Sequence, residues 1–254
     1  MKLLASDYDG TLFRNSRIDK EDITAICKFK EKGNLFGIVT GRSFGFIERE
    51  LNKNNIPYDF IICINGGYIE DRDKNVIYEK QIPLEIANQI VEQVKNEKIQ
   101  LGIICDGILS EVFVFRMKII KTIAHFFHHR LYQYQLKPRN RKIVRNISIH
   151  AKEEKYTNEI IEKLQTQFND YIECNRNGET IIDVSGKGTA KENAVQRVAD
   201  YFGVSDIYVI GDSYNDIEMI RAFDGFAISN ANEEVLSIAK KEFSNFKAVV
   251  EYII

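Results

Sequence analysis

Four polar clusters in the sequence each follow directly on an apolar stretch. They are Asp7 with Asp9, Thr40 with Gly41 and Arg42, Asn65 with Gly66, and Asp212 with Asn215 and Asp216. Polar side chains at the ends of buried strands are well placed for chemistry, because the carboxyl ends of parallel strands meet at one edge of a sheet. If the four stretches are neighbouring parallel strands, the clusters converge on a single crevice.

The residue types in these clusters indicate a divalent cation and a phosphate group. Three separate carboxylate positions around one point repel each other unless a cation lies among them. Carboxylates, waters and a phosphate oxygen are the usual environment of magnesium in proteins. A bound phosphate dianion also needs a nearby lysine, and both Lys187 and Lys191 precede the predicted helix that starts near residue 190.

Each of these signals also has an ordinary structural explanation. Asp and Gly are common in turns, and Asp and Asn commonly cap helices. Lys191 taken alone is a typical solvated helix residue. The sequence Gly186-Lys187-Gly188-Thr189 is not a P-loop, because Gly follows the lysine and Ile181 occupies the position of the first glycine. The order and placement of the four clusters together favour a shared site.

The two ends of the chain have an alternating strand and helix pattern. The first part predicts strands at Lys2–Ser6, Leu35–Val39 and Phe60–Ile64, separated by helices over 20–32 and 43–53. The last part predicts a helix over 190–201, a strand at Ile207–Ile210, a helix over 215–222, a strand at Phe226–Ile228 and a helix over 231–240. Continuous apolar strands that alternate with helices are typical of a parallel sheet covered on both faces.

The middle of the chain has a different pattern. After a hairpin of Tyr68–Glu70 and Val76–Glu79, it predicts a helix that begins at Pro83, strands at 99–105 and 111–115, a helix within 116–135, a strand at 143–150, a helix over 153–168 and strands at 171–175 and 179–185. We therefore expect an α/β fold: a Rossmann-like parallel-sheet core of residues 1–80 and 187–254, with an inserted α+β cap domain of residues 81–186.

The clusters together resemble the four motifs of the haloacid dehalogenase-like (HAD) phosphatases. The matching residues are Asp7-Tyr8-Asp9-Gly10-Thr11-Leu12, Thr40-Gly41-Arg42, Lys191, and Gly211-Asp212-Ser213-Tyr214-Asn215-Asp216. The place of the insertion resembles the subgroup with a type IIB cap. Two further segments, Asn65-Gly66-Gly67 and Asp183–Lys191, resemble the Cof-like members. The resemblance spans nearly the whole chain.

The resemblance implies a role for each matched residue. Asp7 would be the nucleophile that forms an aspartyl-phosphate, and Asp9 would give a proton to the leaving group and then take one from water. Thr40 and Lys191 would complete the catalytic set by binding the phosphoryl oxygens. Phosphate or substrate binding would involve Gly41, Arg42, Asn65, Gly66 and Asn215.

The resemblance also implies a cofactor and a substrate class. Mg²⁺ would bind Asp7, the main-chain carbonyl of Asp9, and Asp212, while Asp216 would order these ligands without binding the metal itself. The substrate would be a small phosphorylated metabolite of the sugar phosphate, flavin or pyridoxal phosphate type. Whether Lys187 assists Lys191 stays open.

Composition narrows the class of protein further. The chain has 254 residues, of which 44% are hydrophobic and 28% charged, which excludes wholesale disorder and a small disulfide scaffold. It has no apolar run of the roughly 18 residues that a membrane helix needs. Charges begin too early in the chain for a signal peptide. We therefore expect a cytoplasmic protein without a membrane partner.

The segment 112–152 is strongly basic, with ten of the 35 Lys and Arg residues and none of the 37 Asp and Glu residues. It could attract an anionic substrate, bind nucleic acid, or form a solvated surface. We expect most of the segment to form a solvated surface, which argues against nucleic acid as a partner. A few of its basic residues are expected to attract the substrate, from among Arg116, Lys118, Lys121, Arg139, Arg141 and Lys142.

Two alternatives to a phosphatase use the same residues. A phosphomutase with the nucleophile Asp7 would return the phosphoryl group to a second hydroxyl. A catalytically silent protein of this fold would bind anions or nucleic acid without turnover. The complete set of Asp7, Asp9, Lys191 and Asp212 favours an enzyme, and the sequence does not indicate an oligomeric state.

Overall fold

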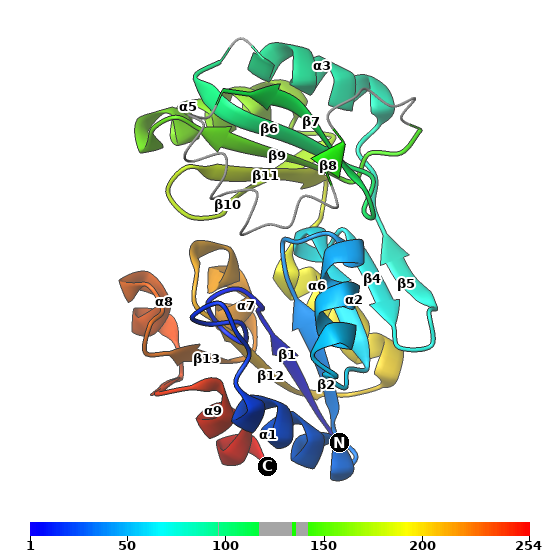
Figure 1. Cartoon of the computed structure of the whole chain (residues 1–254), viewed down its shortest axis with the longest axis vertical. Helices are drawn as coiled ribbons and strands as arrows, with labels where there is room; N and C mark the ends of the chain where they lie inside the picture. The colour runs from blue at the N-terminus through cyan, green and yellow to red at the C-terminus, as the bar shows by residue number, and fades with distance from the viewer. Residues whose placement is uncertain (96, 117–133, 136–141) are drawn as a thin grey trace. The chain divides into compact units, whose positions relative to one another are not determined.

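The computed structural model describes residues 1–95, 97–116, 134–135 and 142–254. The chain forms two compact units (Figure 1). The core unit consists of Met1–Glu79 and Ala190–Ile254, and the inserted unit consists of Lys80–Thr189. Among the described residues, no helix combines the length and the apolar character that crossing a membrane requires.

The core unit is built on an eight-stranded mixed sheet in the order β14-β13-β12-β1-β2-β3-β4-β5. The strands from β14 to β3 run parallel, and β4 and β5 continue the sheet as antiparallel strands. Their bounds are β1 Lys2–Ser6, β2 Leu35–Val39, β3 Phe60–Cys63, β4 Tyr68–Asp71, β5 Val76–Glu79, β12 Asp206–Gly211, β13 Asp224–Ile228 and β14 Lys241–Phe243.

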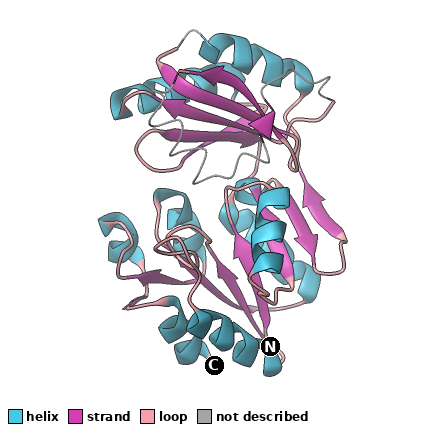
Figure 2. Ribbon diagram, viewed as in Figure 1, coloured by secondary structure: helices cyan, strands magenta, loops and turns pink. Residues whose placement is uncertain are grey.

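Helices cover both faces of the core sheet (Figure 2). One face packs against α1 Lys20–Glu31, α2 Phe44–Lys53 and α9 Phe246–Ile253, with aromatic side chains such as Phe29 and Phe36 fully buried. The other face packs against α6 Lys191–Phe202, α7 Ile217–Ala222 and α8 Glu233–Ile238. Burial on both faces explains why the middle of β1 and the whole of β2 consist of apolar residues. Each large apolar side chain buried in this way contributes about 1.5–3 kcal/mol.

The inserted unit has its own six-stranded sheet, in the order β10-β11-β9-β6-β7-β8. Its pairs are antiparallel except for β7 and β8. Two helices pack on one face of this sheet around a separate core. The elements are α3 Leu84–Lys95, β6 Ile99–Cys105, β7 Ser110–Phe115, β8 Tyr134–Gln135, β9 Asn146–Ala151, α5 Glu154–Phe168, β10 Ile172–Arg176 and β11 Ile181–Gly186.

The architecture confirms an α/β core with an inserted α+β unit, but some elements differ from the sequence predictions. The helix predicted within 116–135 is wrong at Tyr134–Gln135, which pair as a strand with Ser110 and Glu111. The rest of that prediction, 117–133, lies outside the described residues. The sequence reasoning also missed β14 and α9. The strand β3 ends at Cys63, because Ile64 begins a tight 3₁₀ turn.

Candidate active site

The four predicted clusters lie at the carboxyl ends of neighbouring parallel strands in the core unit. Asp7 follows β1, and its main-chain N–H donates to the carbonyl of Ile210 in β12 at 2.9 Å. Thr40 follows β2 and donates to the carbonyl of Ile62 in β3, also at 2.9 Å. These bonds extend the parallel ladders by one residue, so the strands themselves fix where the polar side chains begin.

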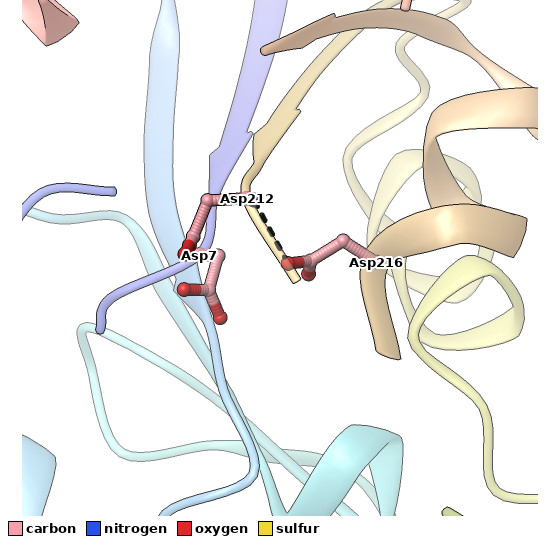
Figure 3. A group of neighbouring side chains, drawn as sticks. All are labelled: Asp7, Asp212 and Asp216. Atoms are coloured by element: carbon pink, nitrogen blue, oxygen red, sulfur yellow. Dashed lines mark hydrogen bonds between the residues drawn. The ribbon is translucent and has the colours of Figure 1, made fainter. Parts of the chain in front are cut away.

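Three carboxylates gather at this edge of the sheet. Asp7, Asp212 and Asp216 each offer an oxygen within 4.8 Å of the others. Figure 3 shows Asp7 and Asp212 at the ends of adjacent strands, with Asp216 coming from the loop that leads into α7. Asp216 is fully buried and Asp7 is only 6% exposed.

The side chain of Lys191, at the first turn of α6, lies between two of these carboxylates. Its Nζ donates to Oδ1 of Asp7 at 2.7 Å and to Oδ1 of Asp216 at 2.6 Å. Lys191 is itself only 2% exposed. Burial lowers the pKa of Lys191, but the charges of Asp216 and Asp7 outweigh this effect and raise the pKa overall, so the ammonium stays charged. One buried cation thus pairs with two buried carboxyl groups and offsets only part of their negative charge.

Both carboxylate oxygens of Asp216 accept hydrogen bonds from within the protein. Its Oδ1 accepts from Lys191, while its Oδ2 accepts from the main-chain N–H groups of Asp212 and Ser213, both at 3.1 Å. The bond from the Ser213 N–H is one half of a capping box between Ser213 and Asp216, at the start of the short turn Tyr214–Asp216. Asp216 therefore holds the loop that carries Asp212.

The remaining oxygens of Asp7 and Asp212 are suited to a divalent cation. Oδ1 of Asp212 accepts from the Thr11 hydroxyl at 2.7 Å, and Oδ1 of Asp7 accepts from Lys191. Within the described part of the chain, no hydrogen bond to Oδ2 of either residue is present. Carboxylate oxygens are the ligands that Mg²⁺ prefers, so the donor set fits this ion.

The protonation of these two carboxyl groups is shifted by their surroundings. Burial raises the pKa of Asp7 well above its usual range; the Lys191 ammonium opposes the shift, and the charges of Asp216 and Asp212 add to it. Burial, followed by the charge of Asp216, raises the pKa of Asp212 to about 6. Both shifts reflect crowded anions in a poorly solvated place, which a bound cation would relieve.

Gly10 allows the chain to turn closely past Asp212. Its φ is +84°, and a Cβ at this position would lie 2.2 Å from Oδ2 of Asp212. Because the left-handed conformation also disfavours side chains, only glycine fits here without moving the carboxylate. The carbonyl of Gly10 accepts from the Asn230 amide at 3.0 Å, which ties this turn to the loop after β13.

The turn after β3 contains two consecutive residues in the left-handed region. Ile64 has a φ of +54° and Asn65 a φ of +49°. This conformation is rare for a β-branched residue and costs about 1–3 kcal/mol. It is held by two main-chain hydrogen bonds, from Ile64 to the carbonyl of Arg42 at 3.1 Å and from Asn65 to the carbonyl of Thr40 at 3.0 Å. The turn therefore locks the two loops together.

Asn65 also contacts the loop that carries Asp212. Its Oδ1 accepts from the side-chain amide of Asn215 at 3.3 Å, and its own Nδ2 is buried with no hydrogen-bond partner among the described residues. Gly66 packs under α6, close to the carbonyl of Ala190. Asn65 thus joins the end of β3 to the loop after β12, and Gly66 joins it to the start of α6.

Arg42 lies against Asp9 rather than against the buried carboxylates. Its Nε and one terminal nitrogen contact the two oxygens of Asp9, the second at 2.6 Å. The Thr40 hydroxyl accepts from the main-chain N–H of Arg42 at 3.1 Å, and Gly41 completes the turn between them. The roles of Arg42 and Gly41 in phosphate or substrate binding stay predictions.

The structure brings together most of the predicted residues and adds two. Thr11 and Asn230 were not predicted, although Thr11 directly follows Gly10 in the first motif.

Lys187 belongs to the inserted unit, where its Nζ contacts Glu173 and Asn169, each at 3.2 Å. Of the basic residues expected to attract substrate, Arg116 instead contacts main-chain carbonyls of Lys95 and Glu97. Lys118, Lys121, Arg139 and Arg141 lie outside the described residues.

Comparison with known proteins decides the family. The sequence profile of the haloacid dehalogenase-like hydrolases matches residues 4–253. The chain belongs to this family. A Bacillus subtilis relative, the 5-amino-6-(5-phospho-D-ribitylamino)uracil phosphatase YitU, is 25% identical, and the match covers 94% of this chain and 90% of the relative. The Escherichia coli phosphatase YbjI, which acts on the same compound, is 24% identical over 94% of this chain and 89% of its own length.

Solved structures show the same fold. A HAD subclass IIB sugar phosphatase, BT4131, aligns with a TM-score of 0.80 at 23% identity, covering 100% of this chain and 99% of that one. A HAD-like hydrolase from Bacillus subtilis aligns with a TM-score of 0.85 at 18% identity. The chain is therefore a member of the haloacid dehalogenase-like hydrolases that shares its fold with a subclass IIB phosphatase.

Proposed function

We propose that this HAD phosphatase hydrolyses the phosphate monoester of a small phosphorylated metabolite through an aspartyl-phosphate on Asp7. The observation that carries the proposal is the position of Asp7. Its buried carboxylate accepts a 2.7 Å hydrogen bond from Lys191 and lies beside Asp212, so Lys191 and a cation held by the two carboxylates would both neutralise charge next to the nucleophile. Positioning and charge neutralisation of this kind are what phosphoryl transfer requires.

The residues of the core unit supply each step of the reaction. A carboxylate oxygen of Asp7 attacks phosphorus, the bond to the ester oxygen breaks, and that oxygen takes a proton from the Asp9 carboxyl group. Water then attacks the aspartyl-phosphate and gives a proton to the Asp9 carboxylate. The bond between phosphorus and Asp7 breaks, which releases inorganic phosphate and restores both carboxyl groups.

The other residues hold the phosphoryl group and the cofactor. Lys191, Thr40 and the main-chain N–H groups near Gly41 bind phosphoryl oxygens, with Asn65, Gly66 and Asn215 shaping the same pocket. Asp7, Asp212 and the carbonyl of Asp9 would hold Mg²⁺, while Asp216 keeps Asp212 in place through its loop. The bound ion supplies neutralisation of charge between the carboxylate and the phosphate.

The relatives support a polyhydroxylated substrate. YitU acts on a phosphorylated ribityl compound, and the structural neighbour BT4131 is a sugar phosphatase. We therefore place sugar phosphates and the phosphorylated ribitylaminouracil first among the candidates, followed by flavin mononucleotide and pyridoxal phosphate.

The test is phosphate release from a panel of these esters, with Mg²⁺ or with EDTA, by the wild-type protein and by Asp7→Asn. We expect release that needs Mg²⁺ and that falls at least about a thousandfold in Asp7→Asn, because the amide is not a nucleophile. An isomerised sugar phosphate in place of free phosphate would show a phosphomutase. No product from any ester, with a folded protein, would contradict the proposal.

A further inference from the structure

Arg42 and Asp9 form a two-point ion pair. Nε and one terminal nitrogen of Arg42 donate to the two separate carboxylate oxygens of Asp9, the latter contact at 2.6 Å. A planar guanidinium that meets a carboxylate in this way fixes its orientation as well as its charge. A lysine at the same position would keep the charge and lose the fixed orientation.

The guanidinium of Arg42 is itself held by its neighbours. It stacks over the ring of Phe46 in α2, 4.0 Å from the ring centroid, and lies 5.8 Å from the centroid of Tyr8. The main chain of Arg42 is tied to Thr40 and to Ile64 by hydrogen bonds of 3.1 Å each. The position of the guanidinium is therefore set by α2 and by the turn after β2.

Asp9 has no comparable support of its own. Its side chain is 44% exposed, and within the described residues Arg42 is its only hydrogen-bond or ion-pair partner. An exposed carboxylate without a fixed partner samples several rotamers. Proton transfer, however, requires the donor within hydrogen-bond reach of the reacting oxygen.

We infer that Arg42 is a positioning residue, which holds the Asp9 carboxyl group where it can exchange protons with the ester oxygen and with water. This inference rests on the proposed function and assigns Arg42 a role different from phosphate binding. In the first step the proton passes from Asp9 to the ester oxygen as its bond to phosphorus breaks. In the second step a proton returns to Asp9 from the attacking water.

The two roles of Arg42 predict different effects of the leaving group. An alkyl ester needs a proton on its departing oxygen, whereas p-nitrophenolate leaves readily without one. The ratio kcat/KM reports only the steps up to formation of the aspartyl-phosphate, so it isolates the first proton transfer. If Arg42 acts through Asp9, replacing it harms the alkyl ester far more than p-nitrophenyl phosphate.

The experiment compares kcat/KM for the best alkyl phosphate of the panel with kcat/KM for p-nitrophenyl phosphate. We expect Arg42→Gln and Arg42→Lys to lose about ten- to a hundredfold on the alkyl ester, which is less than the roughly 10²–10⁴-fold that a positioned acid contributes, because Asp9 itself remains. On p-nitrophenyl phosphate the loss should stay within about threefold. Arg42→Lys keeps the positive charge, so it tests the fixed geometry even if Arg42→Gln folds poorly.

A double variant supplies the second readout. If Arg42 acts only through Asp9, Asp9→Asn combined with Arg42→Gln should be no slower on the alkyl ester than Asp9→Asn alone. The matched control is Arg221→Gln, which removes an exposed arginine paired with Glu218 in α7 and should leave both esters unaffected.

Other outcomes would overturn the inference. Equal losses on the two esters would mean that Arg42 binds the phosphoryl group, and multiplied losses in the double variant would mean that it acts independently of Asp9. Faster turnover of the alkyl ester by Arg42→Gln would mean that the pair holds Asp9 away from its task. Failure of the proposed function looks different, because the wild-type protein would then release no phosphate from any ester.

Discussion

The close approach of Gly10 to Asp212 allows a test of the metal site that separates local from global effects. In Gly10→Ala the new Cβ would lie 2.2 Å from Oδ2 and 2.7 Å from Cγ of Asp212, whereas ordinary contacts begin near 3.4 Å. The carboxylate, or the turn, must therefore move by about an ångström or more. Asp212 can move only by giving up its 2.7 Å hydrogen bond from Thr11.

The size of the effect follows from the coordination that Mg²⁺ demands. This ion binds oxygens near 2.0–2.1 Å in almost ideal octahedral geometry, so a ligand displaced by about an ångström is lost. We expect the Mg²⁺ concentration for half-maximal activity to rise at least about tenfold, which corresponds to about 1.4 kcal/mol. The left-handed φ of +84° adds a cost of about 1–2 kcal/mol to folding, because alanine disfavours that conformation.

Gly33 supplies the matched control. Its φ is +77°, and a Cβ there would meet no atom within 4 Å. Gly33→Ala should therefore lose a similar 1–2 kcal/mol of unfolding free energy in urea while its Mg²⁺ requirement stays unchanged. The reasoning is refuted if Gly10→Ala is half-saturated by Mg²⁺ within twofold of the wild type, or if Gly33→Ala loses Mg²⁺ affinity equally.

Three further predictions concern the buried charges and the C-terminal helix. Lys191→Met should abolish turnover and lower the free energy of unfolding by about 3–5 kcal/mol, as measured by urea unfolding. The reason is that the substitution leaves the carboxyl groups of Asp7 and Asp216 buried without the lysine that pairs with them. Because the pKa of Asp212 is raised to about 6, protons compete with Mg²⁺ for this carboxylate below that pH. In activity titrations, the Mg²⁺ concentration for half-maximal activity should therefore fall as the pH rises from about 5 to about 7. Asn245→Ala removes the hydrogen bond that caps α9 and should cost about 1 kcal/mol by urea unfolding with unchanged kcat.

Each of these has a contradicting outcome. Wild-type stability in Lys191→Met would mean that the buried carboxylates take up protons at little cost. An Mg²⁺ requirement that is the same at both ends of the pH range would mean that the acidic groups are already ionised in the metal-free protein. A loss of activity in Asn245→Ala would show that α9 supports the site as well as the fold.

The convergence of the site could be predicted from the sequence because it depends on strand order. Polar residues that follow continuous apolar strands must meet at one edge of a parallel sheet, which brought Asp7, Thr40 and Asp212 together. Lys191 begins a helix that packs on that same sheet, so its buried pairing with Asp7 is consistent with this logic.

Other features depend on contacts that a single sequence does not display. The strand β14 has three residues, two of them exposed charges, and forms only by pairing with β13. The helix α9 did carry a signal that was missed, since Phe246, Val249, Val250 and Ile253 are spaced as one buried helical face.

The finer geometry of the site could not be predicted from the sequence either. The left-handed Ile64 contradicts its local preference and is imposed by the bonds to Thr40 and Arg42. The pairing of Arg42 with Asp9 depends on rotamers in two different loops. In both cases tertiary contacts impose a conformation that the local sequence does not favour.

The central position of β1 has a consequence for the protein during its synthesis. β1 pairs with β2 soon after both have left the ribosome, but its other neighbour is β12, where Val209 lies opposite Ala5. Until that late segment emerges, β1 keeps one open edge, a place where other chains can pair. Asp7, which is made before Lys191 and Asp212, meanwhile lacks both of these neighbours. The nascent chain therefore carries an incomplete site until the segment with Lys191 and Asp212 has been made.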